Sequence, residues 1–227
     1  MATPKKGYWL DGKRLPGTTT IIGRFKNSAG LMHWAFQQGQ SGASHLYEQA
    51  NIAADIGTLA HSMIEHHING DDPRIGLSAV DAEHADKATN AFKMYLEWEA
   101  QTGLKFLSKY QEIQLVSPEY KFGGTPDAIG VIDGKICLLD WKTSNGVYAD
   151  YLIQLAAYRH LINDGIQMRT GAPLPFKVKD GAHLLRFPKE FPDFDHRFFG
   201  DLDDDAWEQF KHFRAAYEID KRLEKRV

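Results

Sequence analysis

The residues of this chain whose types and spacing best suit chemistry are two aspartates and a lysine placed around a predicted turn. Asp127 begins one apolar run, and Asp140 and Lys142 end the next, with Asp133-Gly134 between the two runs. An Asp-Gly pair is favoured in two-residue type I′ hairpins. We therefore expect an antiparallel hairpin with these three charged residues at its open end. Carboxylates placed there can bind a divalent cation, and a lysine can stabilise an anion.

The register of this hairpin decides whether the two carboxylates meet. If Ile132 pairs with Lys135, Asp127 lies directly opposite Asp140, and Lys142 lies on the same face. Directly opposed residues have Cβ atoms about 5 Å apart, and like charges at that separation are unfavourable. The two carboxylates would then either share a proton or bind a divalent cation.

The remaining residues of the hairpin are mostly apolar on both faces. The face shared with the carboxylates carries Ile129, Val131, Ile136 and Leu138, and the opposite face carries Ile132, Cys137, Leu139 and Trp141. Such a hairpin belongs inside a sheet that is covered on both sides. A simpler interpretation makes Asp127 and Lys142 surface charges at strand ends, but a second acid in register disfavours it.

The pattern Pro126-Asp127, followed by Asp140-Trp141-Lys142, resembles the signature of the PD-(D/E)xK nuclease superfamily. The longer string LLDWKTS, followed by QLAAY, is similar to the RecB-like exonuclease branch, and most closely to mitochondrial genome maintenance exonucleases and related phage exonucleases. The resemblance runs in order through most of Tyr8 to His160. It implies a restriction-endonuclease-like core, a metal-dependent nuclease activity, and a role in DNA repair or recombination.

The resemblance also implies a set of metal ligands and catalytic residues. A histidine after a glycine completes the metal site in the resembled family, which points to His61 in GTLAHSMIEHH. The implied ligands of one or two Mg²⁺ or Mn²⁺ ions are His61, Asp127, Asp140 and the backbone carbonyl of Trp141. Lys142 would orient or deprotonate the attacking water, or stabilise the developing charge.

Substrate-binding candidates follow the lysine in the sequence. In the resembled family the Q-x-x-x-Y pair, here Gln154 and Tyr158, contacts the nucleic-acid backbone. We expect Thr143 to bind the substrate together with this pair. The i, i+4 spacing puts Gln154 and Tyr158 on one helix face, although an ordinary amphipathic helix with a packed tyrosine has the same spacing. Trp34 and Tyr148 could stack unpaired bases, although burial is expected for each.

Two glutamates are candidates for places beside the metal. Glu65 lies one turn after His61 and could orient its ring, as metal-bound imidazoles usually require, although a solvent-facing position fits it equally well. Glu112 matches a glutamate often seen in the resembled family. A zinc-protease site is excluded, because His61, Glu65 and His66 match neither H-E-x-x-H nor H-x-x-E-H.

Hydrophobic periodicity and turn residues predict a mixed α/β fold with a central mixed β-sheet flanked by helices. The expected helices cover Leu31 to Gln38, Ala43 to Ala50, Ala53 to Ile68, Asp81 to Gln101, Tyr148 to Ile162 and a last segment with Trp207, Phe210, Phe213 and Tyr217. The expected strands are a hairpin over Tyr8 to Ile22 with Thr18 to Ile22 as its return, strands near Phe106 to Val116, Lys121 to Ile132 and Lys135 to Lys142, and a hairpin around Asp180-Gly181 built from Phe176 to Val178 and His183 to Phe187. We expect a single nuclease domain, 1–227. Residues 1–104 would form a hairpin and helical elaboration that contributes His61, and residues 105–227 would form the nuclease core.

Composition and charge describe an ordinary globular chain. Its 227 residues are 43% hydrophobic and 25% charged, with a formal net charge of −3, which disfavours indiscriminate coating of nucleic acid. No apolar run approaches membrane-spanning length and no leader is recognisable, so we expect a cytoplasmic protein of a bacterium or a phage-infected cell, with no membrane partner. The single cysteine, Cys137, excludes an intramolecular disulfide and a four-cysteine iron–sulfur cluster.

Two charged segments stand out from this average. Lys5 and Lys6 belong to a basic stretch within the first 26 residues that could follow phosphates or could form a solvated terminus. The acidic run Asp201 to Asp205 precedes the last helix and is expected to cap it.

Taken as a set, the candidate residues predict a divalent-metal-dependent DNA exonuclease that acts from the free ends of single-stranded DNA. Two alternatives stay open: a structure-selective endonuclease of the same superfamily, and a nucleic-acid-binding recombination factor without turnover. The complete set of Asp127, Asp140, Lys142 and His61 counts against the binding factor, because an abandoned site would be free to lose members.

Overall fold

The computed structural model describes residues 7–26, 29–40, 42, 48–144, 146–187, 195–200 and 204–227, without the side chains of residues 31, 34, 38 and 48–54. Several sequence predictions fall outside these residues. They concern Lys5 and Lys6, the first part of the helix expected from Ala43, the acidic residues 201–203, and the side chain of Trp34. The fold and the site below rest on the described ranges alone.

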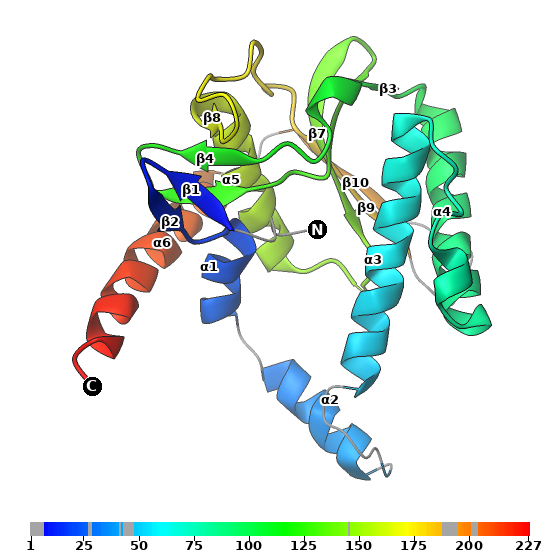
Figure 1. Cartoon of the computed structure of the whole chain (residues 1–227), viewed down its shortest axis with the longest axis horizontal. Helices are drawn as coiled ribbons and strands as arrows, with labels where there is room; N and C mark the ends of the chain where they lie inside the picture. The colour runs from blue at the N-terminus through cyan, green and yellow to red at the C-terminus, as the bar shows by residue number, and fades with distance from the viewer. Residues whose placement is uncertain are drawn as a thin grey trace.

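A mixed β-sheet forms the centre of the described chain (Figure 1). Within the described residues it has five strands in the order β10–β9–β7–β6–β3. Their bounds are Lys105–Phe106 for β3, Ala128–Ile132 for β6, Lys135–Lys142 for β7, Ala182–Arg186 for β9 and Asp195–Phe199 for β10. Strands β7 and β9 are parallel, and the other neighbours are antiparallel. The predicted mixed sheet is confirmed.

The hairpin of β6 and β7 has the predicted register. Ile132 pairs with Lys135, and the ladder continues to Ala128 opposite Leu139. Asp133 and Gly134 have φ angles of 51° and 77°, the left-handed conformation that a type I′ turn requires at both central residues. The turn therefore fixes which residues reach the open end of the hairpin.

Helices cover both faces of the sheet, as predicted. On one face lie α1 (Thr18–Phe25), α5 (Ala149–Asp164) and α6 (Asp204–Glu224), which bury Ile21, Leu161 and Phe210 against Ile129 and Leu138. On the other face lie α3 (Glu48–Asn69) and α4 (Ala82–Thr102). Alternate residues of β7 enter the two cores, so the strand is buried on both sides.

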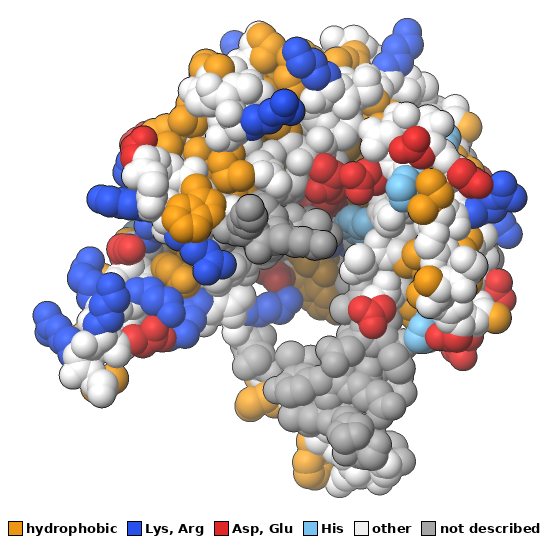
Figure 2. Space-filling view, in the orientation of Figure 1, with side chains coloured by type: hydrophobic (Ala, Val, Ile, Leu, Met, Phe, Trp, Pro, Cys, Tyr) orange, Lys and Arg blue, Asp and Glu red, His pale blue; other side chains and the backbone are white. Residues whose placement is uncertain are grey.

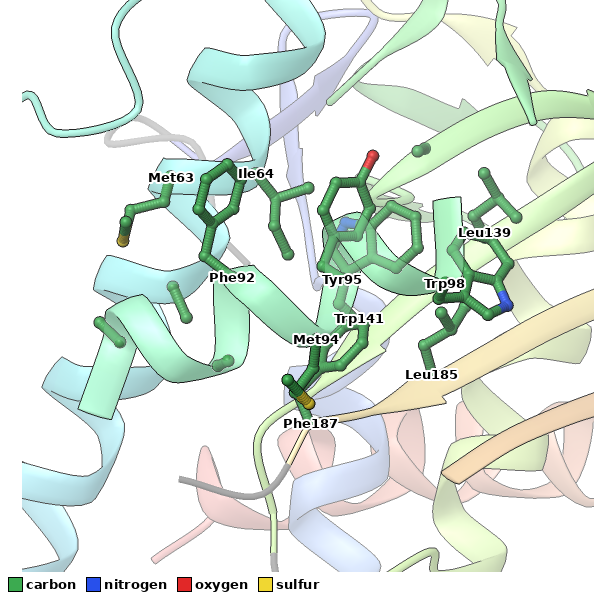
Figure 3. Close-up of a cluster of buried hydrophobic side chains, with 14 of the residues drawn as sticks. Met63, Ile64, Phe92, Met94, Tyr95, Trp98, Leu139, Trp141, Leu185 and Phe187 are labelled. Atoms are coloured by element: carbon green, nitrogen blue, oxygen red, sulfur yellow. The ribbon is translucent and has the colours of Figure 1, made fainter. Parts of the chain in front are cut away.

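The core beneath α3 and α4 is rich in aromatic rings (Figure 3). Tyr95 and Trp98 of α4 meet Trp141 of β7 edge-on, with ring centroids 5.4 and 6.1 Å apart. Met63 and Ile64 of α3 belong to the same cluster. This packing holds α3 beside the end of β7, where the predicted site residues lie.

The remaining described elements are short. Strands β5 (Phe122–Gly124), β4 (Leu115–Ser117) and β8 (Ile166–Gln167) form a small sheet, and β1 (Tyr8–Leu10) pairs with β2 (Lys13–Leu15). Helix α2 covers Ala29–Gln40, close to its expected span, and short 3₁₀ turns η1 and η2 cover Leu77–Ala79 and Ser108–Tyr110. Among the described helices, none combines the length and apolarity that crossing a bilayer requires.

Two strands predicted as continuous are each divided between the two sheets. The segment Phe106 to Val116 contains β3, η2 and β4, and the segment Lys121 to Ile132 contains β5 and β6. Glu112, with a φ of 45°, breaks the first segment, since strand residues have negative φ. Pro126 lies in the break of the second, where its missing N–H costs no ladder bond. The prediction of two long strands was wrong.

The expected strand Thr18 to Ile22 is helical. Gly17 caps α1 with an extended backbone, the hydroxyl of Thr18 donates to the Gly123 carbonyl at 3.0 Å, and Ile21 and Ile22 are buried. Packing of these residues therefore outweighs the β-propensity of threonine and isoleucine.

Two further boundaries differ from the prediction. The helix expected from Ala53 and the described end of the helix expected from Ala43 form one helix, α3, beginning at Glu48. The hairpin partner of β9 is β10, because Val178 turns away from the sheet and its N–H donates to Asn163 at 2.8 Å. Strand β9 nevertheless extends the sheet as expected, beside β7.

Candidate active site

Asp127, Asp140 and Lys142 lie together and buried at the open end of the β6–β7 hairpin. Their exposed fractions are 3%, 0% and 8%. Burying charged groups costs several kcal/mol per ion unless partners compensate, so a cluster of three is a feature that folding alone does not favour.

Asp127 is fixed against β7 by its own side chain. The ladder ends at Ala128, and one carboxylate oxygen of Asp127, Oδ2, accepts a hydrogen bond from the Trp141 backbone N–H at 2.8 Å. Its other oxygen, Oδ1, is buried and has no hydrogen-bond partner among the described residues. Burial raises the pKa of Asp127, and the nearby Lys142 partly opposes this increase.

Asp140 and Lys142, neighbours on one face of β7, form a buried ion pair. Burial, opposed by Lys142 and aided by the charge of Asp127, raises the pKa of Asp140 to about 6. Burial lowers the pKa of Lys142, but the carboxylates of Asp140 and Asp127 outweigh burial, so its pKa lies above the ordinary value. Lys142 is therefore a cation in the folded protein.

His61 reaches the same cluster from α3. Its Nδ1 lies 3.9 Å from Oδ2 of Asp127, and this nitrogen is buried without a hydrogen-bond partner among the described residues, although the side chain is 15% exposed. Burial, with a smaller contribution from the charge of Lys142, lowers the pKa of His61 to about 3. The imidazole is therefore neutral near pH 7, the form that binds metals.

Gly57 lets α3 approach the strand end that carries Lys142. A Cβ atom at position 57 would lie 2.6 Å from Oγ1 of Thr143, which is much closer than a normal contact. Gly57 stands one helical turn before His61, so the close approach at Thr143 brings the imidazole to the carboxylates.

Glu112 adds a further carboxylate to the site, and Glu65 lies close to it. The Glu112 N–H donates to the Asp127 carbonyl at 3.4 Å. Burial, followed by the charges of Asp127 and Glu65, raises the pKa of Glu112 to about 8. Glu65 is exposed and does not hold Nδ1 of His61. Figure 2 shows acidic and histidine side chains side by side in the middle of one face.

Gln154 and Tyr158 share the face of α5 that is turned to the carboxylates. The Gln154 side-chain amide donates to the Tyr158 hydroxyl at 3.1 Å, and both residues are buried. Burial raises the pKa of Tyr158, and the charges of Asp140 and Asp127 raise it further, which shows that the phenol lies near them. Tyr158 is therefore packed and also lies near the carboxylates, whereas the solvent-exposed glutamine of an ordinary amphipathic helix is not found, since Gln154 is 5% exposed.

Comparison with known proteins identifies the family of this chain. The model of the PD-(D/E)XK nuclease superfamily matches residues 32–222, a span that includes every candidate residue above. The chain belongs to the PD-(D/E)XK nuclease superfamily. A search of curated proteins finds no match. A solved structure titled "Crystal structure of SSO0001" is similar at 13% identity over 68% of this chain and 69% of that one, with a TM-score of 0.33, too low to support further argument.

The donor atoms of this candidate site have the chemistry that a divalent cation requires. In the described ranges, no three His, Cys, Asp or Glu side chains are arranged to hold a metal as they stand, and the Asp140 carboxylate is turned to Lys142. However, Oδ1 of Asp127, Oδ1 of Asp140 and Nδ1 of His61 are buried and have no hydrogen-bond partner in the part of the chain that the structure describes. Two carboxylate oxygens and one imidazole nitrogen form a donor set that Mg²⁺ accepts and Mn²⁺ prefers.

Two features of the site were missed in the sequence. The Tyr151 ring lies 5.1 Å from Nζ of Lys142, and its spacing of three residues before Gln154 could have placed it on the site face of α5. The Tyr8 hydroxyl and Oγ1 of Thr125, the residue before Pro126, share a hydrogen bond of 2.9 Å. No pattern in the sequence near either residue indicates this contact. The expectation that Tyr148 is buried was wrong, since 47% of it is exposed.

Proposed function

We propose that this PD-(D/E)XK protein is a divalent-metal-dependent exonuclease that hydrolyses phosphodiester bonds from the free ends of single-stranded DNA. The observation that carries the proposal is the buried group of Asp127, Asp140, Lys142 and His61, with three donor atoms that have no hydrogen-bond partner in the described structure. His61 comes from residues 1–104 and the other three from residues 105–227, so we propose that both parts form one nuclease domain. The string LLDWKTS supports the RecB-like branch.

The cation would be held by Asp127, Asp140, the imidazole of His61 and the backbone carbonyl of Trp141. When bound, it would lower the pKa of water and neutralise charge on the phosphate. Asp127 is already oriented by the Trp141 N–H, and burial of both carboxylates keeps competing water away. Glu112 would add negative charge beside the ligands.

Lys142 would act as a fixed cation close to the phosphate. Its raised pKa keeps the ammonium group charged, which favours orienting the attacking water and stabilising the developing charge over accepting a proton. Displacing Asp140 from the ion pair would free the ammonium for the substrate and the carboxylate for the cation. Gln154, Tyr158 and Thr143 would contact the backbone of the strand.

The burial of the site supports a flexible, unpaired substrate. Asp127 and Asp140 are at most 3% exposed, so the strand would have to fit closely against the protein to bring its scissile phosphate to the carboxylates. An unpaired strand can bend into such a site more easily than a stiff duplex can.

A panel of labelled DNA substrates tests this proposal. We expect linear single strands to be degraded with Mg²⁺ or Mn²⁺, blunt duplex to be cut slowly, closed circular single strands to resist, and chelator to stop all cleavage. Rapid cutting of circular single strands would indicate a structure-selective endonuclease. Tight metal-independent binding without cleavage of any substrate would indicate a recombination factor.

A further inference from the structure

Tyr148 is an exposed aromatic residue at the start of α5. It is the N-cap residue of the helix, and 47% of it is exposed. Exposure alone does not distinguish this ring, since Phe36 and Phe198 are also more than half exposed, but Tyr148 lies beside the candidate site. Its location suggests a binding role.

Tyr148 is connected to the candidate active site through one further ring. Tyr148 and Tyr151 meet edge to face, with centroids 5.6 Å apart and an interplanar angle of 77°. The Tyr151 ring in turn lies 5.1 Å from Nζ of Lys142. The two tyrosines therefore form an aromatic step, Tyr148–Tyr151, that leads from the surface to the buried lysine.

The outer ring of the aromatic step is held in place while much of it stays exposed. Nζ of Lys26 lies 5.5 Å from the Tyr148 centroid, and an ion pair with Asp150 at 2.7 Å keeps Lys26 there. A ring restrained before binding loses little entropy when a ligand stacks on it.

We propose that Tyr148 binds an unpaired nucleobase by stacking, and that the aromatic step thereby places a neighbouring phosphate beside Lys142. The proposal rests on the proposed nuclease function and specifies how the strand is held. Every base has a π face, so this contact tolerates any sequence, whereas bases inside a duplex have both faces covered. Lys26, an exposed cation beside the ring, would face the phosphate of the stacked nucleotide.

Binding of an abasic series tests the stacking contact. The probe is a labelled single-stranded oligothymidylate in which one base at a time is removed, with binding measured by fluorescence anisotropy in chelator. For the unmodified protein, removal of the base at one position should weaken binding about tenfold. Tyr148→Ala should weaken binding of the intact probe by about the same factor and abolish the effect of base removal at that position alone.

Two variants serve as controls. Tyr148→Phe keeps the stacking face and should bind as the unmodified protein does. Phe198→Ala removes a ring that is 52% exposed at the far edge of the sheet and should change nothing. The stacking proposal is overturned if Tyr148→Ala binds every probe as the unmodified protein does. It is also overturned if the variant binds all probes equally more weakly and still loses affinity when the base at that one position is removed. If the unmodified protein neither binds nor cuts single strands, the proposed function itself fails.

Discussion

Lys142 is the residue whose role can be separated from metal binding. Lys142→Ala removes the ammonium group and leaves Asp127, Asp140 and His61 in place. Because the freed Asp140 loses its ion-pair partner, Mn²⁺ affinity in calorimetry should be kept or increased, while cleavage should fall by at least about a hundredfold. Lys135→Ala, an exposed lysine on the same strand, is the control and should keep both properties. Persistent turnover, or a collapse of metal affinity, would contradict this role.

Glu112 gives the metal-free protein a pH-dependent stability. Burial, and then the charge of Asp127, raise the pKa of Glu112 from 4.5 to about 8. Between these values the folded protein binds more protons than the unfolded chain, so the free energy of unfolding should fall as pH rises. Below about pH 6.5 the buried neutral His61 opposes this trend, because its pKa is lowered from 6.5 to about 3. Thermal unfolding in chelator should therefore show Tm decreasing from about pH 6.5 to about pH 8, and Glu112→Gln should flatten this slope. An unchanged slope in the variant would mean that Glu112 is not the titrating group.

At the scale of elements, the position of α3 depends on one glycine. In an exposed helix, Gly→Ala stabilises by about 1 kcal/mol, but inserting a methyl group into a packed contact costs about 1–3 kcal/mol. The Cβ of Gly57→Ala would lie 2.6 Å from Oγ1 of Thr143. The cost of this steric contact should therefore exceed the gain in helix stability. We expect Gly57→Ala to lower both stability and nuclease activity, because α3 carries His61.

Repeating Gly57→Ala in a Thr143→Ala variant separates two effects: the steric contact of the new Cβ with Oγ1 of Thr143, and the intrinsic preference of a helix for alanine over glycine. With Oγ1 removed, Gly57→Ala should become stabilising by about 1 kcal/mol in chemical denaturation. Gly23→Ala in α1 has no atom within 4 Å of the added Cβ and should stabilise by a similar amount in both backgrounds. A Gly57→Ala effect of the same sign and size in both backgrounds would show that Thr143 does not limit the approach of α3.

At the scale of the whole molecule, the predictable parts are those that local signals determine. The Asp133-Gly134 turn set the register that brings Asp127 near Asp140, and the apolar runs indicated a sheet covered on both faces. Long-range contacts were not predictable. Thr18 became helical because of packing in a core formed by distant segments, and nothing local reveals that Tyr151 lies beside Lys142.

The boundaries between the two sheets illustrate the same limit. The sequence from Lys121 to Ile132 is β-prone throughout, yet it leaves one sheet after Gly124 and enters another at Ala128. Pro126 marks the break, but a proline can equally occupy an edge strand. The sequence therefore indicated that the charged residues meet at the open end of the hairpin, but it did not indicate how the strands around them divide between two sheets.

The most direct test of the central claim is cleavage of end-labelled linear single-stranded DNA by the unmodified protein and by Asp140→Asn. The substitution keeps the side-chain shape and removes the charge that would hold the cation beside Asp127. With Mg²⁺ or Mn²⁺ the unmodified protein should degrade the strand, and the folded variant should be slower by at least about a hundredfold. Chelator should abolish the activity of both proteins. Cleavage by folded Asp140→Asn at the unmodified rate, or cleavage that persists in chelator, would contradict a metal-dependent nuclease site at the end of the β6–β7 hairpin.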